Sequence, residues 1–151
     1  MIRSRRDAMR SGAALSALAA AGLLSPAQLR AMPARSAFDA RSLADALAAI
    51  GGTPADSKAL LIDVPEVAED GAIVPVSVIS KLPNTEEIHV LVEKNRWPLA
   101  ASFKLGRHTE PRIEARFKMA ESTKVMIVVK ADGRLYSAVR ETRVTIGGCG
   151  G

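Results

Sequence analysis

The chain contains little cysteine, histidine and aromatic side chain. Its 151 residues include one cysteine and two histidines, and only 3% are aromatic. A single cysteine excludes an intrachain disulfide and a C-x-x-C redox pair. His89 and His108 are far apart in the sequence, with no other histidine at ligand spacing, so no metal site is predicted. No Ser-His-Asp grouping, phosphate loop or paired-carboxylate motif stands out. We therefore expect neither an enzyme nor a resident cofactor.

The mature part of the chain has no excess of positive charge. The formal net charge of +5 arises entirely within residues 1–35, where six arginines oppose one aspartate. Residues 36–151 hold 15 basic and 15 acidic residues. Because binding to nucleic acid or an anionic membrane requires a clustered basic face, we expect neither partner.

Residues 1–35 have the composition of an export signal. Arginines are followed by the small-residue apolar stretch Gly12–Leu24, which is shorter than the roughly 20 residues of a membrane-spanning helix. Arg5 and Arg6 resemble a twin-arginine motif, although a plain secretory or mitochondrial-type leader remains an alternative. The cleavage site is left open, with candidates at Ala27, Ala34 and Ala40. We expect a periplasmic protein.

The mature chain begins with a predicted helix over residues 36–50. Leu43, Leu47 and Ile50 recur on one helical face, which indicates a helix that packs on the domain as a structural brace. Asp39 is the expected cap at its start, and the glycines and proline that follow Ile50 are expected to end it.

Seven short segments rich in β-branched residues follow, each bounded by turn residues. They are Leu60–Val64, Ile73–Ile79, Ile88–Glu93, Leu99–Leu105, Arg112–Met119, Val125–Lys130 and Leu135–Ile146. The best hairpin turn is Asp132-Gly133. Residues 36–146 are therefore predicted to form a helix plus an all-β, immunoglobulin-like antiparallel sandwich. Val125–Val129 is apolar on both faces, which predicts a central strand or one covered by a partner.

The lone cysteine, Cys149, lies in a terminal run of glycines. The flanking residues Gly147, Gly148, Gly150 and Gly151 give the backbone wide freedom, so residues 147–151 are predicted to form a flexible arm. Five extended residues span at most about 17 Å. A thiol flanked by residues without side chains suits threading into a narrow cleft of another protein. Cys149 is therefore the predicted site of covalent substrate attachment.

The residues that surround this cysteine resemble those of the SoxY family of sulfur-compound carriers. The ending Val144–Gly151 matches the terminal motif of that family. Internal blocks at Asp70–Val76, Pro98–Phe103 and Lys130–Tyr136 also match, and the resemblance covers roughly residues 39–151.

The resemblance implies a carrier that holds sulfur intermediates on Cys149 during thiosulfate oxidation. It also implies a SoxZ-like β-sandwich partner in a SoxYZ complex, a heterodimer or heterotetramer. The enzymes expected to act on Cys149 in turn are SoxAX-like, SoxB-like and SoxCD-like. The alternative from the residues alone is an exported structural β-sandwich whose cysteine forms an interchain disulfide.

Other side chains are weaker candidates for a site. Arg96, Arg107 and Arg112 could contact an anionic adduct or a docking enzyme, although solvated surface charges are the more common explanation. Trp97 is expected to be a wedge at a strand end or a partner contact. A metal-delivery module is disfavoured because histidine and methionine are scarce.

Overall fold

The structure, a computed structural model, describes residues 37–146. The predicted export signal, with Arg5 and Arg6, and the glycine arm, with Cys149, lie outside the described residues. The elements in chain order are η1 (Ala37–Asp39), α3 (Leu43–Ile50), β1 (Ala55–Asp56), β2 (Leu60–Asp63), β3 (Val67–Asp70), β4 (Val74–Ser80), β5 (Thr85–Val92), β6 (Leu99–Lys104), β7 (Arg112–Phe117), β8 (Thr123–Ala131) and β9 (Arg134–Ile146).

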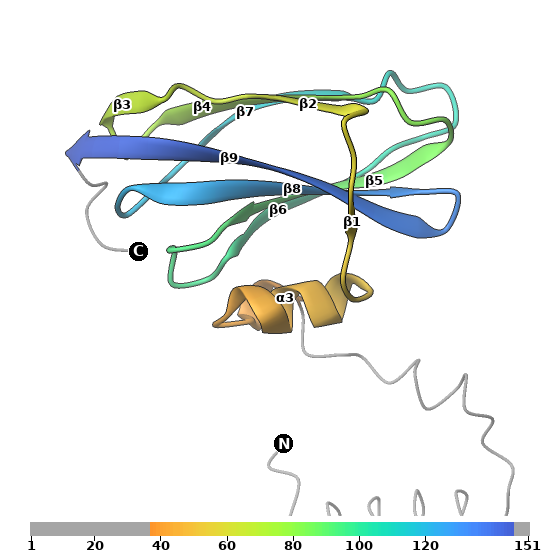
Figure 1. Ribbon diagram of the computed structural model, residues 1–151, viewed down its shortest axis with the longest axis horizontal. Helices are drawn as coiled ribbons and strands as arrows, with labels where there is room; N and C mark the ends of the chain where they lie inside the picture. The colour runs from red at the N-terminus through yellow and green to blue at the C-terminus, as the bar shows by residue number, and fades with distance from the viewer. Residues whose placement is uncertain (1–36, 147–151) are drawn as a thin grey trace, which may run out of the picture. The chain divides into compact units, whose positions relative to one another are not determined.

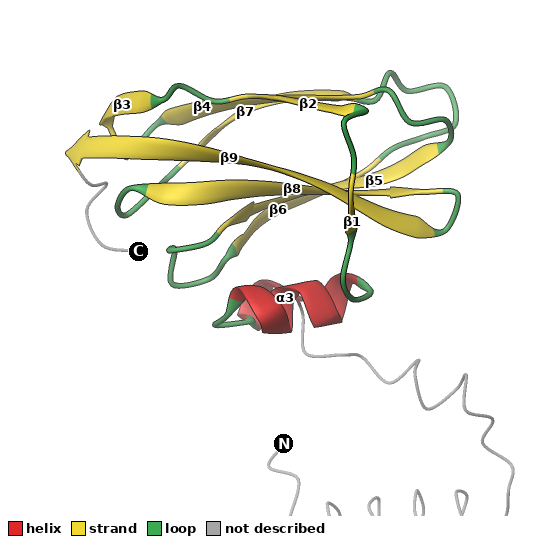
Figure 2. Ribbon diagram, viewed as in Figure 1, coloured by secondary structure: helices red, strands yellow, loops and turns green. Residues whose placement is uncertain are grey.

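The strands form two sheets that face each other across the core, with the helix outside them (Figures 1 and 2). One sheet has the order β1-β9-β8-β5-β6, with β3 also paired to β9, and the other has the order β2-β4-β7. Alternate residues of both sheets point inward, because successive side chains of a strand face opposite sides. They include Val76 and Val78 of one sheet and Val90 and Ile127 of the other, all at most 1% exposed. The predicted all-β sandwich is confirmed.

The seven predicted strands are present, and two further strands were missed. β1 and β3 are only two and four residues long, and both pair in parallel with β9. Elements this short have no apolar alternation to detect, since β1 is exposed throughout and β3 buries only Ala68. The Asp132-Gly133 turn is confirmed, with positive φ at both residues.

The helix begins later than the sequence indicated. Its N-cap is Ser42, whose hydroxyl accepts a hydrogen bond from the backbone N–H of Asp45. Asp39, the predicted cap, instead ends the 3-10 turn η1. Ser42 is the better cap because its backbone is extended there and its side chain reaches the third helical N–H. Gly51 ends the helix with φ 131°, as predicted. No helix between residues 37 and 146 is long and apolar enough to cross a membrane.

Strand β8 lies inside its sheet, between β5 and β9, and both of its faces are covered by the chain itself. Val125, Ile127 and Val129 belong to the core between the sheets, whereas Val128 packs in a second cluster with Ala46 of the helix. The helix is therefore a structural brace over the outer face of the larger sheet. The suggestion that a partner binds the Val125–Val129 strand is wrong, because these valines and Ile127 are fully buried.

Candidate functional site

The glycine arm starts where β9 ends, and the described residues show how that point is held. Ile146 is paired in parallel with Asp70 of β3, and its carbonyl accepts a hydrogen bond from the N–H of Gly71 (2.8 Å). The N–H of Val144 donates to the hydroxyl of Ser122 (2.9 Å). Hydrogen bonds on two sides therefore hold the last residues of β9, immediately before the arm. We call these residues the arm root (Val144–Ile146).

The arm root is connected through Gly71 to the loop between β7 and β8. The carbonyl of Gly71 accepts a hydrogen bond from the N–H of Met119 (2.7 Å), while its N–H binds Ile146. Met119 is fully buried and lies between Lys118 and Ala120. A single residue, Gly71, therefore links the arm root to this loop through two backbone hydrogen bonds.

A cationic hollow lies beside that loop. It has a volume of about 90 Å³ and is lined by Asn95, Arg96, Trp97, Lys118 and Ala120. Asn95 holds the two contributing loops together: its amide nitrogen donates to the carbonyl of Lys118 (2.7 Å), and its amide oxygen accepts from the N–H of Ala120 (3.2 Å).

Trp97 of this hollow carries two guanidinium groups over its ring. The Cζ atom of Arg96 lies 4.8 Å from the ring centroid, and that of Arg41 lies 5.5 Å from it. Both distances are within the range of cation–π contacts. The prediction that Trp97 lies at a strand end is confirmed, because it stands two residues before β6; its role as a partner contact stays a prediction.

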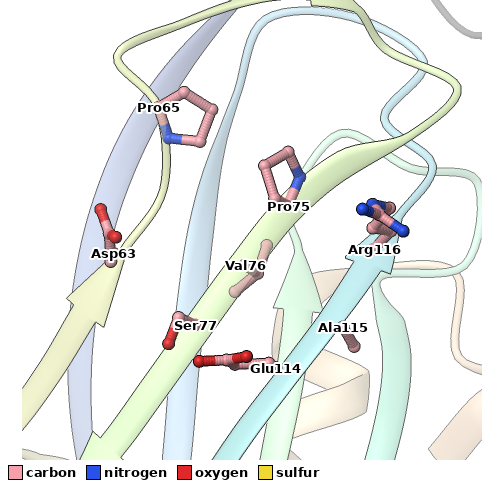
Figure 3. A pocket seen from close by; sticks show the side chains of 8 residues that line it. All are labelled: Asp63, Pro65, Pro75, Val76, Ser77, Glu114, Ala115 and Arg116. Atoms are coloured by element: carbon pink, nitrogen blue, oxygen red, sulfur yellow. The ribbon is translucent and has the colours of Figure 1, made fainter.

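A larger groove crosses the outer face of the three-stranded sheet (Figure 3). Its volume is about 670 Å³, and its lining residues are Asp63, Pro65, Pro75, Val76, Ser77, Glu114, Ala115 and Arg116. Strand β2 ends at Asp63, opposite Ser77, so the earlier part of β4 has no neighbour on that side. Pro75, which has no N–H to leave unpaired, stands in this stretch. Asp63 and Glu114 make the groove a poor site for an anion.

His89 is buried on the outer face of the larger sheet. Its Nδ1 lies 2.9 Å from the hydroxyl of Ser102, and its Nε2 lies 3.3 Å from Glu87 Oε2, a contact without good hydrogen-bond geometry. Burial lowers the pKa of His89, and the Glu87 carboxylate opposes that shift. The residue is 3% exposed, so the group is a buried polar cluster rather than an open catalytic site.

The remaining candidate residues, Arg107 and Arg112, do not line the hollow. Arg112 forms an ion pair with Glu114 on β7, which raises its pKa and satisfies its charge. Arg107 is exposed in the turn between β6 and β7. Within residues 37–146 no cluster of His, Cys, Asp and Glu could hold a metal ion. The sequence did not predict the hydrogen bonds of Asn95 to the Lys118–Ala120 loop or the contact of Arg41 with Trp97. These contacts join segments that are far apart in the sequence, and no local motif indicates them.

Comparison with known proteins identifies close relatives of this chain. Residues 46–149 match the family described as sulfur oxidation protein SoxY. The solved structure of the sulfur carrier protein SoxY from Chlorobium limicola is 40% identical, with a TM-score of 0.63, and covers 70% of this chain and 97% of its own.

More distant structures share the fold alone. A superoxide reductase (neelaredoxin) variant from Ignicoccus hospitalis is 18% identical, with a TM-score of 0.51, and covers 56% of this chain and 78% of its own. No curated protein sequence matches the chain. The family match covers more than half of the chain and includes Cys149, and the Chlorobium structure is related over nearly its whole length. The chain belongs to the SoxY family of sulfur oxidation proteins.

Proposed function

We propose that the chain is a covalent carrier of sulfur intermediates, which it holds on the thiol of Cys149. The observation that supports this most strongly is the family match, which runs from residue 46 to this cysteine. The Chlorobium relative is described as a sulfur carrier protein. Cys149 follows the arm root by three residues and is the only cysteine in the chain, so no other thiol could hold the substrate.

The chemistry of such a carrier begins with the thiolate. Cys149 and thiosulfate join by a new S–S bond, with loss of two electrons to an oxidising enzyme, and give Cys–S–S–SO₃⁻. Attack of water on the terminal sulfur then releases sulfate and leaves the persulfide Cys–S–SH. A free cysteine has a pKa of about 8.5, so a minority is thiolate near neutral pH. The activation and both catalytic steps are therefore assigned to partner enzymes, and this chain is not itself an enzyme.

The proposed work is divided between the sandwich, which holds the arm root, and the short arm that follows it. The arm root is held by the N–H of Gly71, which donates to the carbonyl of Ile146, and by the hydroxyl of Ser122, which accepts from the N–H of Val144. The conformational freedom that we assign to the segment around the thiol rests on Gly147, Gly148, Gly150 and Gly151. Because the arm root is held on the sandwich, it sets the direction in which the arm presents the thiol to a partner enzyme. Glycines without side chains permit entry into the narrow active sites of several enzymes in turn.

The proposed partners are those of a Sox system. A SoxZ-like subunit would bind the sandwich, and SoxAX-like, SoxB-like and SoxCD-like enzymes would bind transiently around the arm. Three exposed apolar side chains near the arm root are the surface that we assign to such contacts: Val67 (54% exposed), Ile73 (60%) and Ile146 (68%). With the twin-arginine-type segment at residues 1–35, the proposed location is the periplasm.

Intact-mass spectrometry of the protein purified from thiosulfate-grown cells tests the carrier function. We expect thiosulfonate and persulfide adducts on Cys149 that a reductant removes, and a Cys149→Ser variant that carries none and does not support thiosulfate oxidation. The variant should still bind its small partner subunit. Only free thiol or a homodimer disulfide in the wild-type protein would contradict the proposal and favour a structural role.

A further inference from the structure

We propose that the cationic hollow at Asn95, Arg96, Trp97, Lys118 and Ala120 is a binding site for a sulfur oxoanion group. The group could be free thiosulfate or sulfate, or the sulfonate end of the adduct on Cys149. The proposal deepens the carrier function proposed above and rests on it for the identity of the anion.

The charges of the hollow are not neutralised by the rest of the described chain. Arg41, Arg96 and Lys118 are exposed, and within residues 37–146 none of them has a carboxylate within ion-pair distance. Arg41 and Arg96 are held over the same indole ring, so their like charges repel each other. An anion beside them relieves this repulsion and accepts charge-assisted hydrogen bonds from the guanidinium groups.

The size and rigidity of the hollow suit a small anion. A volume of about 90 Å³ exceeds the roughly 10–15 Å³ that one water requires, yet it is too small for a segment of polypeptide. The Asn95 side chain bonds the backbone of Lys118 and of Ala120, so both sides of the hollow are fixed relative to each other. Because the backbone of the loops that line the hollow is already held, an anion binds there without the cost of ordering a flexible loop.

The position of the hollow brings it within reach of the arm. The start of β8, the β5–β6 connection and the end of β9 lie at the same end of the sandwich (Figure 1). Gly71 joins Ile146 to Met119, the residue between two lining residues of the hollow. From Ile146, the three residues to Cys149 span up to about 10 Å when extended. A span of that length allows an anionic group on the thiol to approach the hollow.

The larger groove fits this ligand less well. Its single cation, Arg116, is accompanied by the carboxylates of Asp63 and Glu114, which repel an oxoanion. The hollow is lined by two cations and no carboxylate. The charge balance therefore assigns the anion to the hollow.

Trp97 makes the proposal directly testable, because it is the only tryptophan in the chain. Its single indole N–H signal in a nitrogen–proton correlation spectrum of the full-length protein reports on the hollow. The Cys149→Ser protein is titrated with sodium thiosulfate or sodium sulfate, which tests the free anion. The wild-type protein is loaded with tetrathionate, which tests the adduct: the Cys149 thiolate attacks a central sulfur, forms Cys–S–S–SO₃⁻ and expels thiosulfate.

A double variant, Arg96→Gln with Lys118→Gln, removes the two lining cations, and Arg107→Gln is the control that removes an exposed arginine elsewhere. We expect the indole signal to shift with the free anion in the Cys149→Ser protein, with the adduct in the wild-type protein, or with both, and Arg107→Gln in the same backgrounds should respond in the same way. The experiment that gives the shift identifies the source of the anion. The double variant should show no shift or about 2- to 5-fold weaker binding. No shift in either experiment with the lining cations intact, or equal shifts in the double variant, would overturn the proposal. Intact mass checks tetrathionate loading independently, so a failure at the hollow is distinguishable from a failure of the carrier function.

Discussion

His89 Nδ1 lies 2.9 Å from the hydroxyl oxygen of Ser102, and this contact joins β5 to β6 on the outer face of the larger sheet. The imidazole is buried, and Glu87 on its other side is the nearest carboxylate. Because burial disfavours the imidazolium, the pKa of His89 in the folded protein is below 6.5. Lys130 and Lys104 lower it further, and Glu87 opposes them.

This contact predicts a pH-dependent stability. A histidine that is harder to protonate in the folded state binds fewer protons there than in the unfolded chain. The free energy of unfolding therefore falls as the pH drops below about 6.5, until His89 is also protonated in the folded state. In His89→Asn, whose amide can replace Nδ1 towards Ser102, this part of the fall should disappear. The measurement is urea unfolding between pH 7.5 and pH 5.

His108 provides the control, because it is exposed in the turn between β6 and β7. His108→Asn should keep the wild-type dependence of stability on pH. If His89→Asn and the wild type lose stability equally between pH 7.5 and pH 5, His89 does not contribute to the pH dependence.

The second prediction concerns the helix on the outer face of the larger sheet. Ala46 is 0% exposed and packs with Leu91, Leu99 and Val128. Ala46→Leu adds three carbons where the helix touches the sheet, and overpacking of this kind costs about 1–3 kcal/mol. Ala48→Leu makes the same change on an exposed position of the helix and should stay within about 0.5 kcal/mol of the wild type. Thermal or urea unfolding compares them, and equal stabilities would mean that the helix is not held tightly on the sheet.

A third prediction tests the apolar surface near the arm root. Ile73 is 60% exposed and follows Gly71 by two residues, so Ile73→Asp removes an apolar contact next to the point where the arm leaves. Burial of such a side chain contributes about 1.5–3 kcal/mol, so binding to a SoxZ-like subunit should weaken about 10-fold or more. Titration calorimetry or co-purification measures the change.

Val139→Asp is the matched control, since Val139 is also exposed (37%) but lies earlier on β9. Both variants should unfold at nearly the wild-type temperature, because neither side chain is in the core. If Val139→Asp weakens binding and Ile73→Asp does not, the partner covers a different face.

These features show which parts of the molecule were predictable from the sequence. Long strands such as β7 were predictable, because Ile113 and Phe117 point inward and Arg112 and Glu114 outward in plain alternation. β1 and β3 were not, because their place depends on parallel pairing with β9 rather than on their own pattern. The helix start was misplaced because two capping residues lay close together in the sequence and only the backbone geometry selects Ser42.

The site was predictable only where one local motif contains it. Cys149 and its glycines are adjacent in the sequence, so their chemistry could be inferred directly. The hollow depends on Asn95 reaching the backbone of Lys118 and Ala120, more than twenty residues further along the chain. Such contacts between loops follow from the packing of whole strands, and composition does not predict them.

The last prediction concerns the glycines that flank the thiol. Gly148→Val places a branched side chain next to Cys149, which restricts the backbone and widens the segment that must enter an enzyme cleft. Because Gly148 comes after the paired end of β9 at Ile146, the free energy of unfolding should not change. Enzymatic loading of Cys149 with thiosulfate should slow about 10-fold, which corresponds to about 1.4 kcal/mol in the barrier. Thr145→Val, at an exposed position of the arm root, places a valine before the glycines without adding bulk, because threonine is already branched, and it should load at the wild-type rate. Loading is followed by intact mass over time. Equal rates for Gly148→Val and the wild type would mean that the segment beside the thiol does not enter a narrow cleft, whereas equal slowing in both variants would mean that the loss is not caused by bulk beside the thiol.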